Sequence, residues 1–530
     1  MSNIELNEEF KQALNILENT TRNIFITGKA GTGKSTLLDY FRNNTKKKAV
    51  VLAPTGVAAV NVKGETIHSF FRFKPNITVE KIKKIKSSKT SALYREIETI
   101  IIDEISMVRA DLLDCVDAFL RLNGKKRKLP FGGAQMVLIG DLYQLPPVIQ
   151  SKEKEIFNSY YKSCYFFDAK AFDGLQLEFI ELQKIYRQKD EKFISILNAI
   201  RNNTVDAKSL QALNQRLAPD FKIDQLDYYV YLTPTNRLAA EINNQQLDKL
   251  KTELRIFQGQ IEGDFDQKYL PTEYELKIKV GAQVMLLNND ELGRWVNGTV
   301  GRVTEIGDEV ITVELSEGRL EDVRPNKWEM FHFQFNAHSQ RLETEVVGYF
   351  IQYPIKLAWA ITMHKSQGKT FDKVVVDVSG GIFACGQVYV ALSRCRSLEG
   401  IVLIKPIEKK HILMDWRIVN FLTKYQYKIS EAALPLEKKL KIIQEAIEEG
   451  KLLKITYLKA SDEKSQRTIK PLRLGKMTYL DKPFLGISAY CFARKEERTF
   501  RVDRILQIAP DETLQLEFSS KTGQKILTKN

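Results

Sequence analysis

Short apolar segments alternate with polar turns and with stretches of helical spacing along the first third of the chain. Four of these segments consist mainly of apolar or β-branched residues, and each precedes a loop or a candidate helix: residues 23–27, 49–53, 100–102 and 135–139. Strands that are apolar on both faces are typical of parallel sheets covered by helices. The pattern therefore predicts an α/β domain with a parallel sheet over residues 1–182.

A second α/β series follows over residues 183–428, and it contains a segment of different character. Glycine and β-branched residues alternate between residues 296 and 347, which predicts a small antiparallel insertion. Residues 429–450 are rich in Glu and Lys and are expected to form a helical linker. Residues 451–530 contain short strands with turns, so we expect a separate small β domain.

Composition narrows the classes of function. The chain has 80 Lys and Arg against 66 Asp and Glu, a formal net charge of +14, which favours an acidic polymer as partner. The five cysteines include no C-x-x-C pair, which argues against disulfides and zinc ribbons and is typical of a reducing cytoplasm. No apolar run reaches the roughly 20 residues of a membrane-spanning helix, and the polar N-terminus does not resemble a signal peptide.

The clearest chemical signal follows the first predicted strand. Residues 28–35 read GKAGTGKS and match G-x-x-x-x-G-K-[ST], the phosphate-binding loop. Glycines let backbone N–H groups approach phosphate oxygens, Lys34 can reach the β- and γ-phosphates, and the Ser35 hydroxyl can bind Mg²⁺. A helix after the loop would present its positive N-terminal end to the anion. We expect a nucleoside triphosphate here, bound by Gly28, Ala30, Gly31, Thr32, Gly33, Lys34, Ser35 and Thr36.

Two adjacent carboxylates, Asp103 and Glu104, follow the apolar strand at residues 100–102. Ligands of open α/β sheets bind at the carboxyl ends of the strands, so both are expected near the phosphates. Asp103 would hold the metal and Glu104 would activate the attacking water, whereas the alternative interpretation is a surface loop. Gln144 follows the strand at residues 135–139 and is a candidate sensor of the terminal phosphate.

The order of these motifs resembles that of superfamily 1B DNA helicases of the Pif type, close to the RecD branch. The resemblance covers about residues 5–425 and rests on GKAGTGKST, APTGVAA, TIHSFF, IIDEISM, FGGAQMVLIGDLYQLPPV, HKSQGKTFD and YVALSRCRS. It implies two RecA-like domains that bind ATP and Mg²⁺ between them. Its implied roles are adenine contact for Gln12, coupling of the γ-phosphate to DNA for Gln144, arginine fingers for Arg187 and Arg394, and cleft-lining positions for Gln367 and Gly368.

The resemblance also implies a grip on single-stranded DNA through phosphate contacts and base stacking. The residues in the matching motifs are Pro54, Thr55, His68, Phe70, Pro146, Thr362, His364 and Lys365. A wedge is expected at about residues 64–90, and the insertion at about 297–353 would correspond to the family's small barrel. For Phe70 the implied role competes with the local sequence, where Phe70, Phe71 and Phe73 favour a core.

Residues 451–510 resemble a WYL domain, a small barrel linked to nucleic-acid or nucleotide-ligand binding in bacterial regulators. The namesake tripeptide reads Thr-Tyr-Leu at residues 478–480, so its tryptophan is missing. Alternation over residues 498–505 predicts a strand with Phe500 and Val502 on its buried face, and with Arg501 and Asp503 on the other face, where Arg501 is expected to be free. Arg494 and Arg501 are therefore candidates for phosphate contacts.

These features predict a monomeric, ATP-dependent DNA helicase of the bacterial cytoplasm, associated with the nucleoid and acting in genome maintenance, repair or recombination. The resemblance implies 5′-to-3′ movement on single-stranded DNA, and the C-terminal domain would add strand binding or regulation. Single-stranded and forked DNA are the expected partners, with RNA–DNA hybrids and G-quadruplexes as further candidates. Two alternatives stay open: an ATP-gated nucleic-acid-binding regulator without unwinding, and an RNA helicase.

Overall fold

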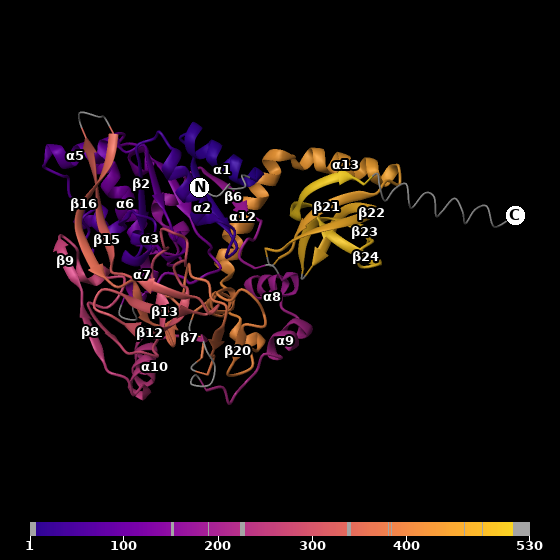
Figure 1. The fold of residues 1–530 in the computed structure, drawn as a ribbon. Helices are drawn as coiled ribbons and strands as arrows, with labels where there is room; N and C mark the ends of the chain where they lie inside the picture. The colour runs from indigo at the N-terminus through magenta and orange to yellow at the C-terminus, as the bar shows by residue number, and fades with distance from the viewer. Residues whose placement is uncertain are drawn as a thin grey trace. The chain divides into compact units, whose positions relative to one another are not determined.

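The chain divides into two compact units, Met1–Met414 and Asp415–Asn530 (Figure 1). The computed structural model describes residues 7–149, 153–188, 190–222, 228–336, 341–379, 381–382, 384–460, 462–479 and 481–511. Within these ranges, no helix has the length and apolar character needed to cross a membrane.

The first unit begins with a parallel sheet in the order β3-β2-β4-β5-β1-β6. The four strands expected from the apolar segments are present, and β3 and β6 extend the sheet at its edges. Side chains such as Phe10, Ile26 and Leu37 pack in one core between the sheet and two helices. The strands are β1 Asn23–Gly28, β2 Ala49–Ala53, β3 Glu65–Thr66, β4 Thr99–Ile102, β5 Gln135–Ile139 and β6 Leu177–Leu182, and the helices are α1 Glu8–Asn19, α2 Lys34–Asn44, α3 Gly56–Asn61, α4 Ile67–Phe70, α5 Ser88–Glu96, α6 Ala110–Asn123 and α7 Lys154–Tyr160.

A second, smaller parallel sheet has the order β18-β7-β19-β20. Its strands are distant in sequence because a long insertion separates β7 from β18. This confirms an α/β fold with two parallel sheets. The strands are β7 Val230–Thr233, β18 Ala360–Thr362, β19 Val374–Val376 and β20 Ile401–Leu403, and the helices are α8 Glu191–Arg201, α9 Ala207–Asn214, α10 Asn236–Lys249 and α11 Gln387–Ser393.

The antiparallel insertion is longer than the predicted residues 297–353, because its strands extend from Arg255 to Leu357. The alternation of glycine and β-branched residues identified only its later strands. A five-stranded sheet, β14-β13-β12-β11-β17, encloses the apolar core of this insertion. The strands are β8 Arg255–Gln258, β9 Gln260–Gly263, β10 Glu275–Ile278, β11 Gln283–Leu286, β12 Val300–Ile306, β13 Ile311–Leu315, β14 Leu320–Val323, β15 Asn326–Asn336, β16 Arg341–Gln352 and β17 Ile355–Leu357.

Strands β15 and β16 form a long hairpin that touches the first parallel sheet (Figure 1). The backbone N–H of Phe333 donates to a Glu65 carboxylate oxygen at 2.7 Å, and the Phe333 ring lies 5.9 Å from that of Phe70. Glu65 belongs to β3, so the start of the predicted wedge, residues 64–90, is part of the main sheet. The wedge itself stays a prediction.

The second unit is a five-stranded antiparallel sheet, β24-β23-β22-β21-β25, with two helices before it. Residues 429–450 are not a simple linker, because Ile443 and Ala446 pack into the same core as the sheet. The elements are α12 Trp416–Ala433, α13 Leu436–Glu448, β21 Leu453–Leu458, β22 Lys464–Tyr479, β23 Lys482–Cys491, β24 Glu496–Arg501 and β25 Ile505–Pro510.

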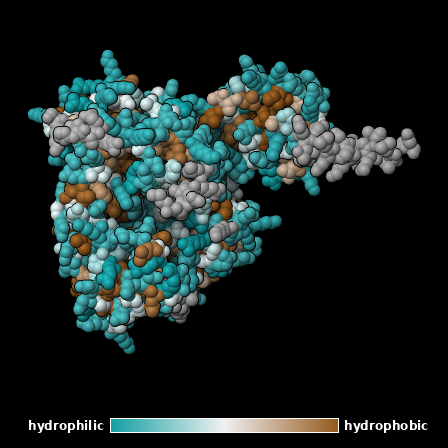
Figure 2. All heavy atoms as spheres, turned by 45° about the horizontal axis from the view of Figure 1, so that its top comes forward, coloured by the Kyte–Doolittle hydropathy of each residue, from teal (hydrophilic) through white to brown (hydrophobic). Residues whose placement is uncertain are grey.

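Hydrophilic residues cover most of the visible face of the first unit, with hydrophobic residues in small separate groups (Figure 2). Since large apolar patches mark interaction sites, this face gives no such signal.

Candidate nucleotide-binding cleft

The loop between β1 and α2 has the backbone that its glycines predict. Gly28, Gly31 and Gly33 have φ values of 155°, 80° and 86°, and Gly33 caps α2 in the left-handed conformation. A Cβ atom on Gly28 would lie 2.6 Å from the Thr32 hydroxyl oxygen and 2.7 Å from the Leu182 carbonyl oxygen. Side chains at this position would therefore open the loop.

Lys34 lies folded against this loop. Its Nζ donates to the carbonyl oxygens of Gly28 at 2.7 Å and Lys29 at 3.0 Å. Burial lowers the pKa of Lys34, and the nearby carboxylates of Asp141 and Glu104 oppose that shift. The ammonium group thus has only carbonyl partners at short range and is available to exchange them for phosphate oxygens.

Asp103 and Glu104 follow β4, where the sequence places them. Glu104 has a φ of 50°, a left-handed conformation that turns the chain sharply behind Asp103. Burial raises the pKa of Asp103, and the neighbouring Glu104 raises it further. Burial also raises the pKa of Glu104, against the pull of Lys34 and Arg394.

A divalent cation fits this donor set. Two adjacent, half-buried carboxyl groups gain from a positive charge, and Ser35 at the start of α2 adds a hydroxyl oxygen. The described residues contain no cluster of three His, Cys, Asp or Glu that could hold a metal ion. Mg²⁺ commonly combines one or two protein ligands with phosphate oxygens, so this pattern is typical of a metal that arrives with its nucleotide.

The cleft is a cavity of about 830 Å³ lined from both halves of the first unit. Of the residues that the sequence predicted, the lining contains Ala30, Gly31, Thr32, Gly33, Lys34, Ser35, Thr36, Glu104, Gln144, Arg187, Gly368 and Arg394. Four predicted residues are not in the lining: Gln12, Gly28, Asp103 and Gln367. Gln12 is exposed on α1, where Phe10 instead reaches the cavity, and the predicted adenine contact of Gln12 stays a prediction.

Both predicted arginine fingers are in the cleft. Arg394 is 1% exposed, and its guanidinium donates to the Val390 carbonyl oxygen at 3.0 Å and the Ser393 hydroxyl oxygen at 3.1 Å. Burial lowers the pKa of Arg394 to about 9, and the nearby Arg187 contributes to that shift. One terminal nitrogen of Arg187 is buried without a hydrogen-bond partner, and so is the amide nitrogen of Gln367. Unpartnered buried donors of this kind are suited to an anionic ligand.

The loop before Arg187 lies directly on the phosphate-binding loop. Tyr186 donates its N–H to the Gly31 carbonyl oxygen at 2.8 Å. A Cβ atom on Gly31 would lie only 2.4 Å from the Cβ atom of Arg187, so glycine is required for this approach. Gly31 therefore has a second role that the motif alone did not reveal.

Sequence reasoning missed six lining residues: Phe10, Tyr186, Val296, Asn297, Thr370 and Arg396. Tyr186 could have been found from the sequence, because an aromatic residue next to a predicted arginine finger can stack on a nucleotide base. Val296 and Asn297 had none, because they come from the antiparallel insertion.

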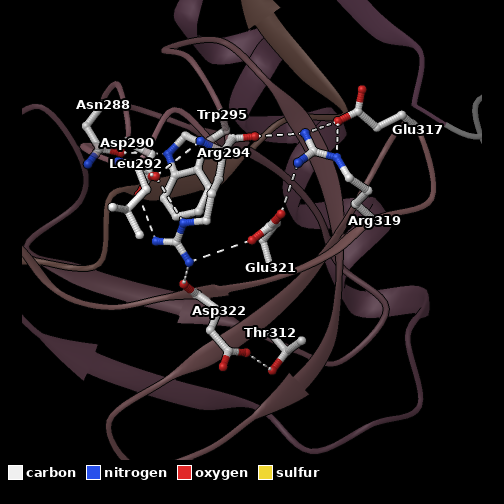
Figure 3. A network of polar contacts seen from close by, with 10 residues as sticks. All are labelled: Asn288, Asp290, Leu292, Arg294, Trp295, Thr312, Glu317, Arg319, Glu321 and Asp322. Atoms are coloured by element: carbon white, nitrogen blue, oxygen red, sulfur yellow. Dashed lines mark hydrogen bonds and ion pairs between the residues drawn. The ribbon is translucent and has the colours of Figure 1, made fainter.

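A network of polar contacts stabilises the loop that leads to Val296 and Asn297 (Figure 3). Arg294 makes paired hydrogen bonds to Asp290 at 3.0 and 2.7 Å, and its guanidinium lies 4.5 Å from the centre of the Trp295 ring. The Trp295 indole N–H donates to the Asn288 side-chain oxygen at 3.1 Å. Asn297 also accepts a hydrogen bond from Lys369, which ties the loop to the segment between β18 and β19.

The predicted DNA contacts lie at or after the carboxyl ends of strands in the two parallel sheets, with Thr362 as the last residue of β18 and His68 in α4. Thr55, His364 and Lys365 are exposed, Pro54, His68 and Pro146 are half-buried, and Thr362 is 3% exposed. The hydroxyls of Thr55 and Thr362 accept backbone N–H groups three residues on, at 3.3 and 3.2 Å, so they shape their loops.

Phe70 does not fit the predicted stacking role. It is 3% exposed, and its ring is surrounded by the rings of Phe71, Tyr94 and Phe333. The local preference for a core was the better guide, because three aromatic residues so close in sequence fill one apolar space.

Two predictions for the second unit need correction. Residues 498–505 are not one strand, because β24 ends at Arg501 and a short 3₁₀ helix follows at Val502–Arg504. Phe500 and Val502 are buried as expected. Arg501 is not free: it makes paired hydrogen bonds to Asp503 at 3.0 and 2.7 Å. Arg494 is exposed at the turn between β23 and β24.

Comparisons with known proteins agree with this geometry. A family model described as PIF1-like helicase matches residues 3–211, and a WYL domain model matches residues 438–510. The ATP-dependent DNA helicase Pif1 of Bdellovibrio bacteriovorus is 32% identical over 434 residues, which cover 80% of this chain and 93% of the relative. The crystal structure of Bacteroides sp Pif1 in complex with ADP-AlF4 matches with 37% identity and a TM-score of 0.74, over 80% of this chain and 98% of its own. Pif1 helicase from Candida albicans matches with 30% identity and a TM-score of 0.61, over 79% of this chain and 99% of its own.

Proposed function

This chain belongs to the Pif1 family of ATP-dependent DNA helicases, and we propose that the cleft described above is its motor site. We propose that the chain moves 5′-to-3′ on single-stranded DNA, the polarity that is characteristic of the family. One observation carries the proposal: a single cavity is lined by the phosphate-binding loop from one parallel-sheet domain and by Arg187 and Arg394 from the other. A site divided in this way links hydrolysis to closure of the two domains.

Lys34 and Glu104 have complementary roles in this proposal. Lys34 exchanges its contacts with the Gly28 and Lys29 carbonyl oxygens for contacts with nucleotide phosphates. Glu104 lines the cavity and orients the attacking water, and the burial that raises its pKa makes it a stronger base. Ser35 and Asp103 would hold Mg²⁺, which supplies positive charge to the phosphates.

Arg187, Arg394 and Gln144 complete the site. The two guanidinium groups stabilise negative charge that develops on the transferred phosphoryl group. Gln144 is 7% exposed and lines the cavity, and its N–H donates to the Asp141 carbonyl oxygen at 3.0 Å. We propose that Gln144 senses the γ-phosphate, since it follows a central strand of the first sheet and lines the same cavity as Arg187 and Arg394.

The DNA strand is proposed to cross the carboxyl edges of both sheets. Exposed Thr55, His364 and Lys365 support this path, and phosphate contacts there need no particular base sequence. Bacteroides Pif1 has been solved bound to single-stranded DNA, and another Pif1 structure is described as the basis for unwinding at forked double-stranded DNA. We propose single-stranded and forked DNA as partners here. RNA–DNA hybrids, G-quadruplexes, a monomeric state and nucleoid association are finer parts of the same proposal.

Strand displacement with tailed duplexes tests the function. We expect unwinding of DNA with a 5′ single-stranded tail, none with only a 3′ tail, and hydrolysis of ATP that single-stranded DNA stimulates. Efficient unwinding of the 3′-tailed duplex would contradict the polarity. Hydrolysis without any unwinding would favour the ATP-gated regulator, and preference for matched RNA substrates would favour an RNA helicase.

A further inference from the structure

A buried chain of polar contacts joins the phosphate-binding loop to the helix that leads to Arg394. The backbone N–H of Ala30 donates to the Tyr389 hydroxyl oxygen at 3.0 Å. That hydroxyl points its own hydrogen towards a carboxylate oxygen of Asp141, at 3.4 Å. The other oxygen of Asp141 pairs with Arg201 at 3.2 Å. Tyr389, Asp141 and Arg201 are 3%, 0% and 5% exposed.

The members of this chain come from both halves of the motor. Ala30 lies in the phosphate-binding loop and Asp141 follows β5, whereas Arg201 ends α8 and Tyr389 lies on α11. A tyrosine hydroxyl has one hydrogen to donate, and here a single hydroxyl both accepts from the first domain and donates to it. Its contacts therefore form only at one separation of α11 from the phosphate-binding loop.

Two further observations show that α11 and α8 are both packed closely at the same interface. A Cβ atom on Gly386, the residue that caps α11, would lie 2.3 Å from the Tyr143 carbonyl oxygen. Arg201 lies 4.1 Å from the centre of the Tyr143 ring. The N-terminal end of α11 thus rests on the segment that carries Asp141 and Gln144.

Arg394 follows Tyr389 by five residues, about 7.5 Å along a helix axis. Its guanidinium is fixed to the same helix by the Val390 carbonyl oxygen and to the preceding loop by Ser366 and Lys369 carbonyl oxygens at 3.4 Å. Because the guanidinium cannot swing independently, the position of α11 decides where Arg394 meets the phosphates.

We propose that Tyr389 is a positioning residue: through its hydroxyl contacts with Ala30 and Asp141 it sets the closed distance at which Arg394 acts. The assignment rests on the proposed function, since it gives Arg394 its role in hydrolysis. Tyr389 acts through Arg394 and touches no phosphate itself. The requirement is geometric, because a displacement of about 1 Å in a catalytic group can reduce a rate about a hundredfold.

The test is a double-mutant cycle of Tyr389→Phe and Arg394→Ala, measured as steady-state ATP hydrolysis over a range of ATP concentrations with saturating single-stranded DNA. We expect Tyr389→Phe to lower kcat by about tenfold to a hundredfold. KM for ATP and affinity for single-stranded DNA should stay within twofold. In the Arg394→Ala background the same change should have no further effect, because the group that it positions is gone.

Tyr94→Phe is the matched control. The Tyr94 hydroxyl is equally buried and donates to the Phe70 carbonyl oxygen at 2.6 Å, away from the cleft. It should lose a similar amount of thermal stability and keep its kcat. If Tyr389→Phe does not fold, Arg201→Lys replaces it, since that change loosens Asp141 while keeping the charge.

Each outcome has one meaning. Equal losses in both backgrounds, an unchanged kcat, or a loss confined to KM would overturn the role of Tyr389. A wild-type chain without DNA-stimulated hydrolysis would instead overturn the proposed function, so the two failures are distinguishable.

Discussion

The nucleotide-binding cleft and the arginine-bearing strand of the C-terminal unit hold similar charges in opposite surroundings. Arg394 is 1% exposed, is surrounded by carbonyl oxygens, and has its pKa lowered by burial to about 9. The Arg501 side chain is 37% exposed and forms an ion pair with the Asp503 carboxylate. A few close neighbours determine the electrostatic interactions of Arg394, whereas solvent and salt screen the charge of Arg501.

The comparison teaches where a single substitution should matter. In the cleft, every charge acts at short range in a medium that screens it poorly, so losing one group removes most of a rate enhancement. On the C-terminal sheet each proposed arginine contact with the strand would add one screened interaction to a larger total. Expected effects therefore decline from the cleft to the C-terminal sheet.

The largest effect is expected for Arg394→Ala. An arginine supplied to the transferred phosphoryl group can be worth about 10³-fold in rate, so DNA-stimulated hydrolysis should fall by that factor while binding of single-stranded DNA is retained. Arg394→Lys is the control, because it keeps a charge but loses the planar fork. Parallel collapse of DNA binding and hydrolysis in the alanine variant would make Arg394 a structural or DNA-contacting residue.

Glu104→Gln should follow, with turnover reduced by about 10²-fold or more and Mg²⁺-ATP binding retained, since the base that orients water is lost. Nucleotide affinity from fluorescence titration, beside steady-state hydrolysis, separates the two properties. Near-normal hydrolysis in this variant would reject Glu104 as the general base and make Asp103 the next candidate for that role.

The sequence predicted the residues of the phosphate-binding side of the cleft better than the contacts between the two domains. The glycines, Lys34 and the two carboxylates could be placed because short motifs fix their backbone and their position at the end of a strand. Arg394 needed the family resemblance, since an isolated arginine in an apolar helix has no local signature. Tyr389, Val296 and Asn297 escaped because their partners are far away in sequence, and no local pattern encodes a contact between domains.

The fold shows the same division. Apolar runs located β1, β2, β4 and β5, whereas the two-residue β3 is too short to leave a pattern. Strand alternation already placed Asp503 on the same face as Arg501, but it did not predict that the 3₁₀ turn after β24 would pair their side chains. Local periodicity therefore predicted elements, and tertiary contacts decided which charges are free.

Glu65 offers an intermediate case, a carboxylate that is 4% exposed yet lies outside the cleft. Burial raises the pKa of Glu65 from its usual 4.5 to about 7, against hydrogen bonds from Phe333 and Ser69. Between these values the folded chain binds a proton that the unfolded chain releases, so stability falls as pH rises from about 4.5 to 7. Glu65→Gln removes this titration, and its stability relative to wild type should grow across the window by up to about 3 kcal/mol.

Calorimetric unfolding at pH 4.5 and pH 8 measures that difference. Glu178→Gln is the control, since Glu178 is a half-exposed carboxylate paired with Arg22 on the surface. An equal pH dependence for wild type and Glu65→Gln would show that the hairpin contact through Phe333 does not keep Glu65 buried in solution.

The smallest effect is expected for the double variant Arg494→Ala/Arg501→Ala, which tests whether the C-terminal sheet contacts the strand. Each phosphate contact contributes about 0.7 to the slope of log affinity against log salt for single strands, so two contacts should lower it by about 1.4 and weaken binding several-fold at low salt. Arg498→Ala is the matched control, because Arg498 lies on the same strand as Arg501, is half exposed and is 3.5 Å from Glu496.

Since Asp503 competes for Arg501 at 2.7 Å, Asp503→Ala should strengthen binding of the single strand and steepen the salt slope. If the double variant matches wild type in affinity and slope, and Asp503→Ala changes neither, the arginines of this sheet are only solvated, and strand binding belongs to the first unit alone.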